Sequence, residues 1–452
     1  MKQKKVLKKI VALLFAFVLA FTMMGCNGGG DAGDADAGAE ADPGTEVEEV
    51  EQAEEQEENQ EVPGDGVVLT INHDKIASPD YHPFFLEASD DLFAATGISL
   101  NPVGYPSTDI YTAAIRSALV TDSPPDLFTW WAGAWTEDLQ RNDLLLPVTQ
   151  IWDKFSDYFP PAVRDAWEVN GELYSLPWGV DYWVVFYNKV IFDELGLSAP
   201  TSWDEFISNC EAIRDAGITP LNQTIVDEWP AFITFQEIAA SYSVSVYNDL
   251  SHGRLSWTSP EAVEIFEIWR DMIEADFFTA PSTHFFSDMP RLFYDGQLAM
   301  IMSGTWYLQS TLLDAGVPEE NVGMFVLRGM DGSQRILMEP SPILVARNGN
   351  NIDEALRAVE YFMSPEGNTF LARHVGSFPV NNMADTSFLM PIKQELSEEI
   401  GTGSYTLSIR FWENMSTTLM LQVNEMFQEF IINPDVEHVT TEIQRLVESY
   451  FD

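Results

Sequence analysis

The chain has 452 residues, of which 71 are acidic and 23 basic, so its formal net charge is −48 at pH 7. This surplus argues against nucleic-acid binding, because no basic stripe is available to displace counterions from phosphates. The six histidines are scattered, and the sequence holds neither a phosphate-cradling glycine loop nor a GxSxG nucleophile elbow. We therefore expect no metal and no cofactor.

The N-terminus has the organisation of an export signal. Several lysines precede the apolar run Ile10–Phe21, which is short for a membrane-spanning helix of about 20 residues. Residues 1–25 are thus predicted to be a lipoprotein signal peptide, cut before Cys26. The segment Met23–Cys26 resembles a bacterial lipobox, although Met23 stands where leucine is usual. Lipidation of Cys26 is the prediction, and a plain signal peptide that leaves a free thiol is the alternative.

The next segment differs sharply in composition from the rest of the chain. Residues 27–65 contain fifteen Asp or Glu and no Lys or Arg. Such a segment cannot bury enough apolar surface to offset its ordering entropy, and its like charges repel one another. We expect residues 26–65 to be a disordered tether behind the lipid anchor. The roughly 385 residues that follow exceed what one core usually organises, so two lobes are expected.

After the tether, strand and helix patterns alternate. Apolar runs rich in β-branched residues predict strands, and amphipathic runs predict helices between them. The predicted strands are Val67–Asn72, Ile98–Val103 and Asp126–Trp131, and the predicted helices are Phe84–Ala95 and Thr108–Val120. Alternation at this spacing indicates a parallel α/β sheet.

Further along the chain, helix starts are well marked. Ser202 and Glu205 fit a capping box, in which each side chain bonds to the other's backbone. Ser259 and Ser364 each precede a proline, a combination typical of an N-cap followed by the first helical residue. In the helix predicted after Ser202, Cys210 shares a face with apolar residues, so we expect it in the core.

Segments in a fixed order carry a resemblance to a known family. They are Pro125–Trp130, Leu144–Val148, Tyr174–Lys189, Leu195–Phe206, Gly296–Trp306, Ser364–Gly367 and Gly376–Pro379. Together they resemble the bacterial extracellular solute-binding proteins of ABC importers, family 1, the sugar-binding relatives of the maltose-binding protein. The most specific match is Tyr174–Lys189, and the landmarks span nearly all of the chain after the tether.

The resemblance implies a two-lobed α/β fold of the periplasmic-binding-protein type, class II. Each lobe is expected to be a mostly parallel sheet flanked by helices, and each is discontinuous in sequence. Residues 66–178 and 342–376 are expected to form the N-terminal lobe, and residues 179–341 and 377–452 the C-terminal lobe. Hinge crossings are expected near Pro177–Val180, Pro340–Ile343 and Gly376–Pro379, with the ligand between the lobes.

A sugar offers C–H faces that pack on aromatic rings and hydroxyls that need carboxylates or amides. Trp130 and Trp131 adjoin at a predicted strand end, so we expect them to face opposite ways. The spacing of the resembled family implies that Trp130 is the one toward the ligand. By the family's spacing, Asp181 should accept sugar hydroxyl bonds and Trp306 should stack. The full predicted ligand set is Trp130, Asp181, Trp306, Trp229, Tyr182, Phe378 and Glu339, with Trp135, Trp178 and Trp412 more readily structural.

The expected function is a monomeric receptor that captures a carbohydrate, an oligosaccharide, and delivers it to ABC permease subunits. It would lie at the cell membrane, lipid-anchored on the extracellular or periplasmic face, and catalyse no reaction. Two alternatives stay open at this stage. A receptor of the same fold could bind a polyamine or another non-sugar ligand, since aromatic rings with carboxylates also suit a cation. A polysaccharide-cleaving enzyme would need two carboxyl groups across the scissile bond.

Overall fold

The computed structural model describes residues 66–74, 81–159, 164, 167–226, 229–401 and 405–451, all within the compact unit Val62–Asp452. The predicted signal peptide, Cys26 and the acidic tether lie outside the described residues. Among the helices of the described part, none combines the length and the apolar character needed to cross a bilayer.

The N-terminal lobe is built on three parallel strands, β1 (Val67–His73), β2 (Ile98–Gly104) and β3 (Leu127–Thr129), with β1 between the other two. Their order confirms the predicted α/β pattern, although β3 is shorter than expected. The helices of this lobe are α2 (Tyr81–Thr96), α3 (Thr108–Ala118), α4 (Ala134–Arg141), α5 (Thr149–Lys154), α13 (Ile352–Met363) and α14 (Pro365–Val375). A small ribbon is formed by β4 (Glu168–Val169) and β5 (Glu172–Leu173).

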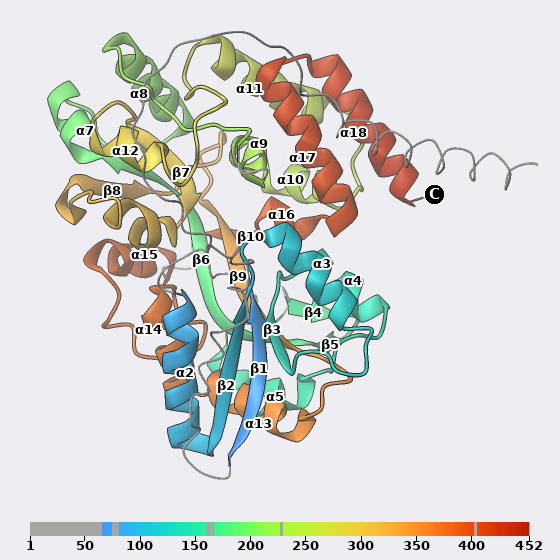
Figure 1. The fold of residues 1–452 in the computed structure, drawn as a ribbon. Helices are drawn as coiled ribbons and strands as arrows, with labels where there is room; N and C mark the ends of the chain where they lie inside the picture. Colours follow the sequence, from blue (N-terminus) through green and yellow to red (C-terminus); the bar gives the residue numbers. More distant parts are fainter. Residues whose placement is uncertain are drawn as a thin grey trace, which may run out of the picture. The chain divides into compact units, whose positions relative to one another are not determined.

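Two long strands join the lobes. β6 (Ser175–Asn188) and β9 (Arg335–Val345) pair antiparallel, and each runs from one lobe into the other (Figure 1). One end of β9 pairs antiparallel with β3, and the other pairs in parallel with β10 (Thr406–Ile409). The predicted boundaries at residues 178 and 341 therefore fall inside strands that both lobes share.

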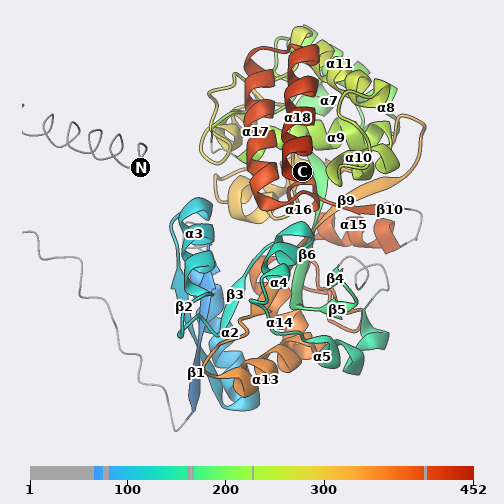
Figure 2. The same ribbon diagram turned by 90° about the vertical axis from the view of Figure 1, so that its right-hand side faces the viewer.

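The C-terminal lobe completes the sheet with β7 (Met300–Gly304) and β8 (Val322–Phe325), both antiparallel to β6. The sheet is thus mixed: parallel among β1–β3 and antiparallel around β6. The helices of this lobe are α7 (Lys189–Leu195), α8 (Trp203–Asp215), α9 (Phe232–Tyr242), α10 (Val244–Ser251), α11 (Pro260–Glu274), α12 (Met289–Tyr294), α15 (Pro391–Gly401), α16 (Phe411–Asn414), α17 (Thr417–Ile432) and α18 (Val436–Phe451). Figure 2 shows α17 and α18 packed side by side.

The third predicted crossing lies against the first. Phe378 and Val180 exchange two backbone hydrogen bonds of 3.0 Å each, so the chain after α14 runs antiparallel to β6. Gly179 lies beside Ser377, whose Cβ would be 3.1 Å from a Cβ added to the glycine. The crossing segments therefore pack backbone to backbone, which leaves little room for a side chain at residue 179.

Local signals for the helices are largely confirmed. The hydroxyl groups of Ser259 and Ser364 cap α11 and α14 by accepting bonds from backbone N–H groups three residues later. The Ser202 hydroxyl caps α8, but Glu205 bonds to the backbone and hydroxyl of Thr201 rather than to Ser202. The reciprocal half of the predicted capping box is therefore shifted by one residue. Cys210 is fully buried, as predicted, and burial raises the pKa of its thiol.

Candidate functional site

A cavity lies where the carboxyl ends of β1 and β3 approach the crossing strand β9. About 320 Å³ of empty space lies within its walls, a volume that includes open solvent. Its lining residues are Asp74, Tyr111, Thr129, Trp130, Trp131, Trp178, Glu339, Pro340 and Ser341. Ligands of α/β proteins bind at this carboxyl edge of the strands, because loops and side chains converge there.

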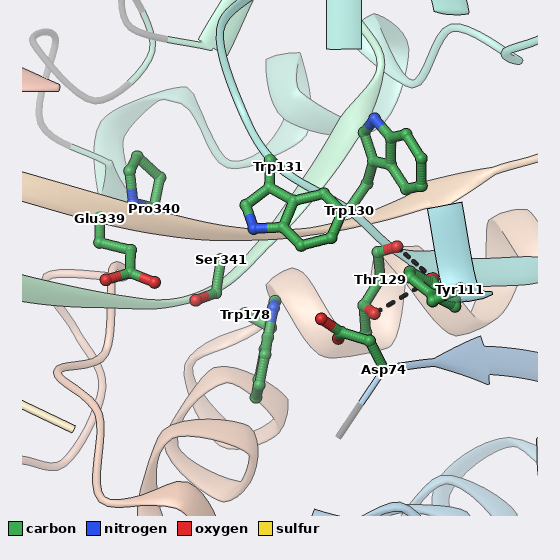
Figure 3. A pocket seen from close by; sticks show the side chains of 9 residues that line it. All are labelled: Asp74, Tyr111, Thr129, Trp130, Trp131, Trp178, Glu339, Pro340 and Ser341. Atoms are coloured by element: carbon green, nitrogen blue, oxygen red, sulfur yellow. Dashed lines mark hydrogen bonds between the residues drawn. The ribbon is translucent and has the colours of Figure 1, made fainter. Parts of the chain in front are cut away.

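Indole rings form much of the cavity wall. Figure 3 shows Trp131 and Trp178 on opposite sides of the cavity, with Glu339 toward one end and Asp74 toward the other. Trp178 stacks on Phe84 with ring centroids 5.5 Å apart, which fixes its plane. Trp131 is only half-buried, so part of its ring remains available for contact.

Trp130 and Trp131 both line the cavity, so the prediction that they face opposite ways is wrong. The strand β3 ends at Thr129, and the alternation of side chains does not extend past the strand end. Trp130 is 4% exposed, and its Nε1 donates to the carbonyl of Trp135 at 3.2 Å. Its contact with a ligand stays a prediction, and Trp131 offers the larger free surface.

Tyr111 lies at the end of the cavity where Asp74 is found (Figure 3). Its hydroxyl lies within hydrogen-bonding distance of the carbonyl oxygens of Asn72, at 3.0 Å, and Thr129, and so ties the ends of β1 and β3 together. Burial, followed by the charge of Asp74, raises the pKa of Tyr111 well above its usual value. The phenol therefore stays neutral and can keep this arrangement over any physiological pH.

Glu339, on β9, is a polar lining group that contacts two side chains of the C-terminal lobe. Its Oε2 accepts a bond of 2.9 Å from the Trp306 indole, and its Oε1 pairs with the Arg410 guanidinium at 2.8 Å. Each carboxylate oxygen has two lone pairs, so each retains one for a further donor. Arg410 is also paired with the fully buried Glu413.

Trp306 belongs to an aromatic group on the C-terminal lobe. Its ring centroid lies 6.2 Å from that of Trp229 and 6.1 Å from that of Phe286, and the last two are 6.2 Å apart. Trp229 and Trp306 are half-buried, whereas Phe286 is 46% exposed. The structure thus brings together two predicted stacking residues and adds Phe286, which the sequence analysis missed.

Asp181 occupies a different environment from the one predicted. It is 3% exposed, and its two oxygens accept bonds of 2.6 Å from the hydroxyl groups of Thr305 and Ser377. It is not among the cavity-lining residues. Burial raises the pKa of Asp181, an effect that the nearby charge of Lys393 and the two hydroxyl groups oppose. Burial also lowers the pKa of Lys393, which donates to the Gly376 carbonyl at 2.5 Å.

Tyr182 and Phe378 lie beside this polar group rather than in the cavity lining. Their rings meet edge to face with centroids 5.1 Å apart, and the Lys393 ammonium lies 5.8 Å from the Phe378 ring centre. Burial, and then the charge of Asp181, raises the pKa of Tyr182 to about 12. The predicted ligand residues therefore lie in three places. Trp130 and Glu339 line the cavity, and Trp229 and Trp306 belong to the aromatic group. Asp181, Tyr182 and Phe378 lie together beside the crossing segments.

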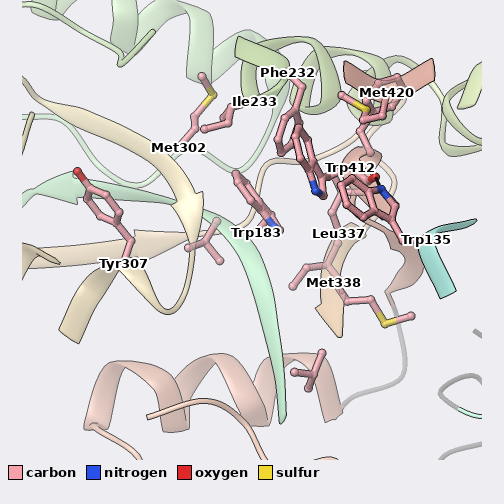
Figure 4. Close-up of a cluster of buried hydrophobic side chains, with 14 of the residues drawn as sticks. Trp135, Trp183, Phe232, Ile233, Met302, Tyr307, Leu337, Met338, Trp412 and Met420 are labelled. Atoms are coloured by element: carbon pink, nitrogen blue, oxygen red, sulfur yellow. Dashed lines mark hydrogen bonds between the residues drawn. The ribbon is translucent and has the colours of Figure 1, made fainter. Parts of the chain in front are cut away.

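Trp135 and Trp412 are structural. The two rings stack with centroids 5.5 Å apart, and the Trp135 Nε1 donates to the carbonyl of Trp412 at 2.8 Å. Figure 4 shows them in a buried cluster with Trp183 and Phe232, beside the cavity-forming strands.

Asp74, by contrast, could have been found from the sequence, because it directly follows a strand of a predicted parallel sheet.

The fold and the site define a solute-binding protein with two lobes joined by crossing strands. Residues 78–369, more than half of the chain, match the family described as bacterial extracellular solute-binding protein. The chain belongs to this family. The sequence-based recognition and the two-lobed fold class are thereby confirmed.

Individual relatives are distant. An uncharacterised ABC transporter extracellular-binding protein of Pyrococcus horikoshii is 21% identical over 355 residues, which is 76% of this chain and 79% of that protein. The maltotriose-binding protein of Pyrococcus abyssi is 27% identical over 277 residues, 59% of this chain and 57% of that protein. Among solved structures, the bacterial solute receptor AcbH, with its preference for β-D-galactopyranose, superposes with a TM-score of 0.75. It is 20% identical, and the superposition covers 86% of this chain and 98% of that one.

Proposed function

We propose that the protein captures a carbohydrate in the cavity between β1, β3 and β9 and delivers it to the permease of an ABC importer. The observation that carries the proposal is the pairing of indole faces with an oriented carboxylate. Trp131 offers a half-buried indole face, Trp178 forms the opposite wall with 3% of its surface exposed, and Glu339 retains a free lone pair on each oxygen. A pyranose needs both kinds of partner, because it combines C–H faces with a rim of hydroxyls.

The charge around Glu339 favours hydroxyl donors over a cation such as a polyamine. The Arg410 guanidinium pairs with Glu339 at 2.8 Å and also with Glu413, so it offsets part of the Glu339 charge and would repel a second cation placed beside it. A neutral hydroxyl meets no such repulsion and can still donate to the carboxylate. Asp74, at the other end of the cavity, is the group that a cation would use, and a polyamine therefore belongs among the tested ligands.

The aromatic group supports an oligosaccharide rather than a single sugar. Trp306 bonds directly to Glu339, and Phe286 extends the aromatic surface from Trp306 toward solvent. A ligand with one ring between Trp131 and Trp178 can then place a further ring against Trp306 and Phe286. The predicted contacts at Trp130, Trp229, Tyr182 and Phe378 belong to the same proposal, while for Asp181 the two internal bonds favour a structural role that can be tested separately.

A second part of the proposed function concerns where in the cell the protein acts. We propose that Cys26 is lipidated after removal of residues 1–25, and that the acidic segment to residue 65 acts as a tether on the outer face of the membrane. The receptor would work as a monomer and would release its sugar unchanged. The relatives support the binding role alone, since each is described as a binding protein or a receptor.

A thermal-shift panel with the purified protein tests the ligand class. Maltotriose, xylotriose, galactose and spermidine are each added at increasing concentration. A ligand at one hundred times its Kd stabilises the folded state by about 2.7 kcal/mol, which corresponds to a rise of roughly 3 °C in Tm for a fold of this size. A rise with a sugar and none with spermidine supports the proposal. A rise with spermidine alone, or release of smaller sugars from maltotriose, contradicts it.

A further inference from the structure

We propose that Arg410 is a positioning residue of the binding site: it holds the Glu339 carboxylate against the Trp306 indole and so fixes the polar and the stacking partner in one geometry. The inference rests on the proposed function, in which Glu339 accepts ligand hydroxyls. Arg410 is not among the cavity-lining residues. Its influence on a ligand would therefore pass through Glu339.

Arg410 is fixed at both ends of its side chain. Its backbone N–H donates to the carbonyl of Met338, the neighbour of Glu339, at 2.9 Å. Its Nε donates to Glu413 Oε2 at 2.7 Å, and Nη1 remains for Glu339. The guanidinium carbon lies 5.8 Å from the centre of the Trp183 ring, within the range of a cation–π contact. With 5% exposure, the group has little freedom to move.

This arrangement makes the Glu339 carboxylate rigid. One oxygen is held by Arg410 and the other by the Trp306 Nε1–H, so rotation of the carboxylate would break both contacts. The planar guanidinium supplies separate N–H groups to Glu339 and to Glu413, which the single ammonium of a lysine cannot reproduce. Trp306 in turn has its indole N–H anchored, which sets the direction of its ring face toward a ligand.

The chain offers a matched control. Arg335 and Glu237 form another buried ion pair in the same lobe, with Nη1 and Oε2 2.8 Å apart and side-chain exposures of 0% and 3%. Arg335 lies on β9 as Glu339 does, but neither member of the pair lines the cavity. Removing Arg335 together with Glu237 leaves neither charge uncompensated, whereas removing Arg410 together with Glu413 leaves the Glu339 carboxylate without its partner, which is the contact under test.

The experiment compares Arg410→Met/Glu413→Gln with Arg335→Met/Glu237→Gln in two measurements. In the ligand-free protein, the indole N–H resonance of Trp306 is followed by NMR. It is assigned as the resonance that is absent from the spectrum of Trp306→Phe. We expect the Arg410 variant to shift this resonance and to speed its hydrogen exchange, and the Arg335 variant to leave both unchanged. In calorimetric titrations with the panel sugars, we expect the Arg410 variant to lose about tenfold or more in affinity and the control less than twofold.

The outcomes separate this inference from the proposed function. An unmoved Trp306 resonance in the Arg410 variant overturns the inference, and so does a moved resonance with wild-type affinity. Equal losses in the two double variants would also overturn it, since they would indicate a general effect of buried pairs. If the wild type binds none of the sugars, the proposed function itself fails and the inference falls with it.

Discussion

Replacing Asp181 with asparagine should destabilise the ligand-free protein, because the carboxylate joins segments that are far apart in the sequence. Its oxygens accept from Thr305, 124 residues away, and from Ser377, 196 residues away, both at 2.6 Å. Asparagine keeps the shape but offers a single, neutral acceptor oxygen, so one buried hydroxyl loses its acceptor and the other exchanges a charged acceptor for a neutral one. Hydrogen bonds to charged groups contribute about 1.5–3 kcal/mol each.

A second contribution comes from Lys393, whose buried ammonium loses the opposite charge of Asp181. From the two contributions together we expect the free energy of unfolding to fall by about 3 kcal/mol, which lowers Tm by roughly 4 °C. Differential scanning calorimetry of the ligand-free protein measures this decrease in Tm. Adding Lys393→Met to Asp181→Asn should recover part of the loss, because the two charges are coupled. Asp193→Asn, an exposed site on α7, should stay within about 0.5 kcal/mol of wild type.

An unchanged Tm for Asp181→Asn would refute this reasoning. If affinity for a panel sugar then fell by tenfold, Asp181 would be a ligand contact, as the family resemblance implies. A fall in both quantities would assign it both roles. The two measurements on one variant therefore separate the hinge role from the binding role.

Three further predictions address other parts of the chain. Burial raises the pKa of Glu413 to about 7 from an ordinary value of 4.5, so the folded protein retains a proton that the unfolded chain loses. The free energy of unfolding should therefore fall by on the order of 3 kcal/mol as the pH rises from 4.5 to 7. Denaturant titrations of Glu413→Gln should show no such pH dependence. Phe286→Ala should weaken the binding of maltotriose but not of galactose in calorimetry, and equal effects on both sugars would contradict the extended site. Trp306→Ala should cost about 1–3 kcal/mol of maltotriose binding without lowering Tm. Cys26→Ser should move the protein from the membrane fraction to the medium or periplasm, and continued membrane association at unchanged mass would exclude the anchor.

The order of elements could be predicted because it depends on neighbours in the sequence. The serine caps at Ser259 and Ser364 bond to backbone groups of their own helices. The β-branched run at Val67–Asn72 favours an extended backbone through its own side chains. Burial of Cys210 followed from helical periodicity alone. Family landmarks in the correct order then gave the two lobes and the crossing segments.

The composition of the site could only be decided by tertiary structure. Whether Trp130 or Trp131 faced the cavity depended on where β3 ends, and the backbone past that point no longer alternates. The partners of Glu339 come from Trp306 and from Arg410, which no local pattern connects to it. Asp181 had the residue type and the position expected of a ligand contact, but its hydroxyl partners are Thr305, directly after β7, and Ser377, in another crossing segment. Such long-range pairs depend on how strands register across the hinge, and this register is set by packing of the whole fold rather than by the residues beside each group.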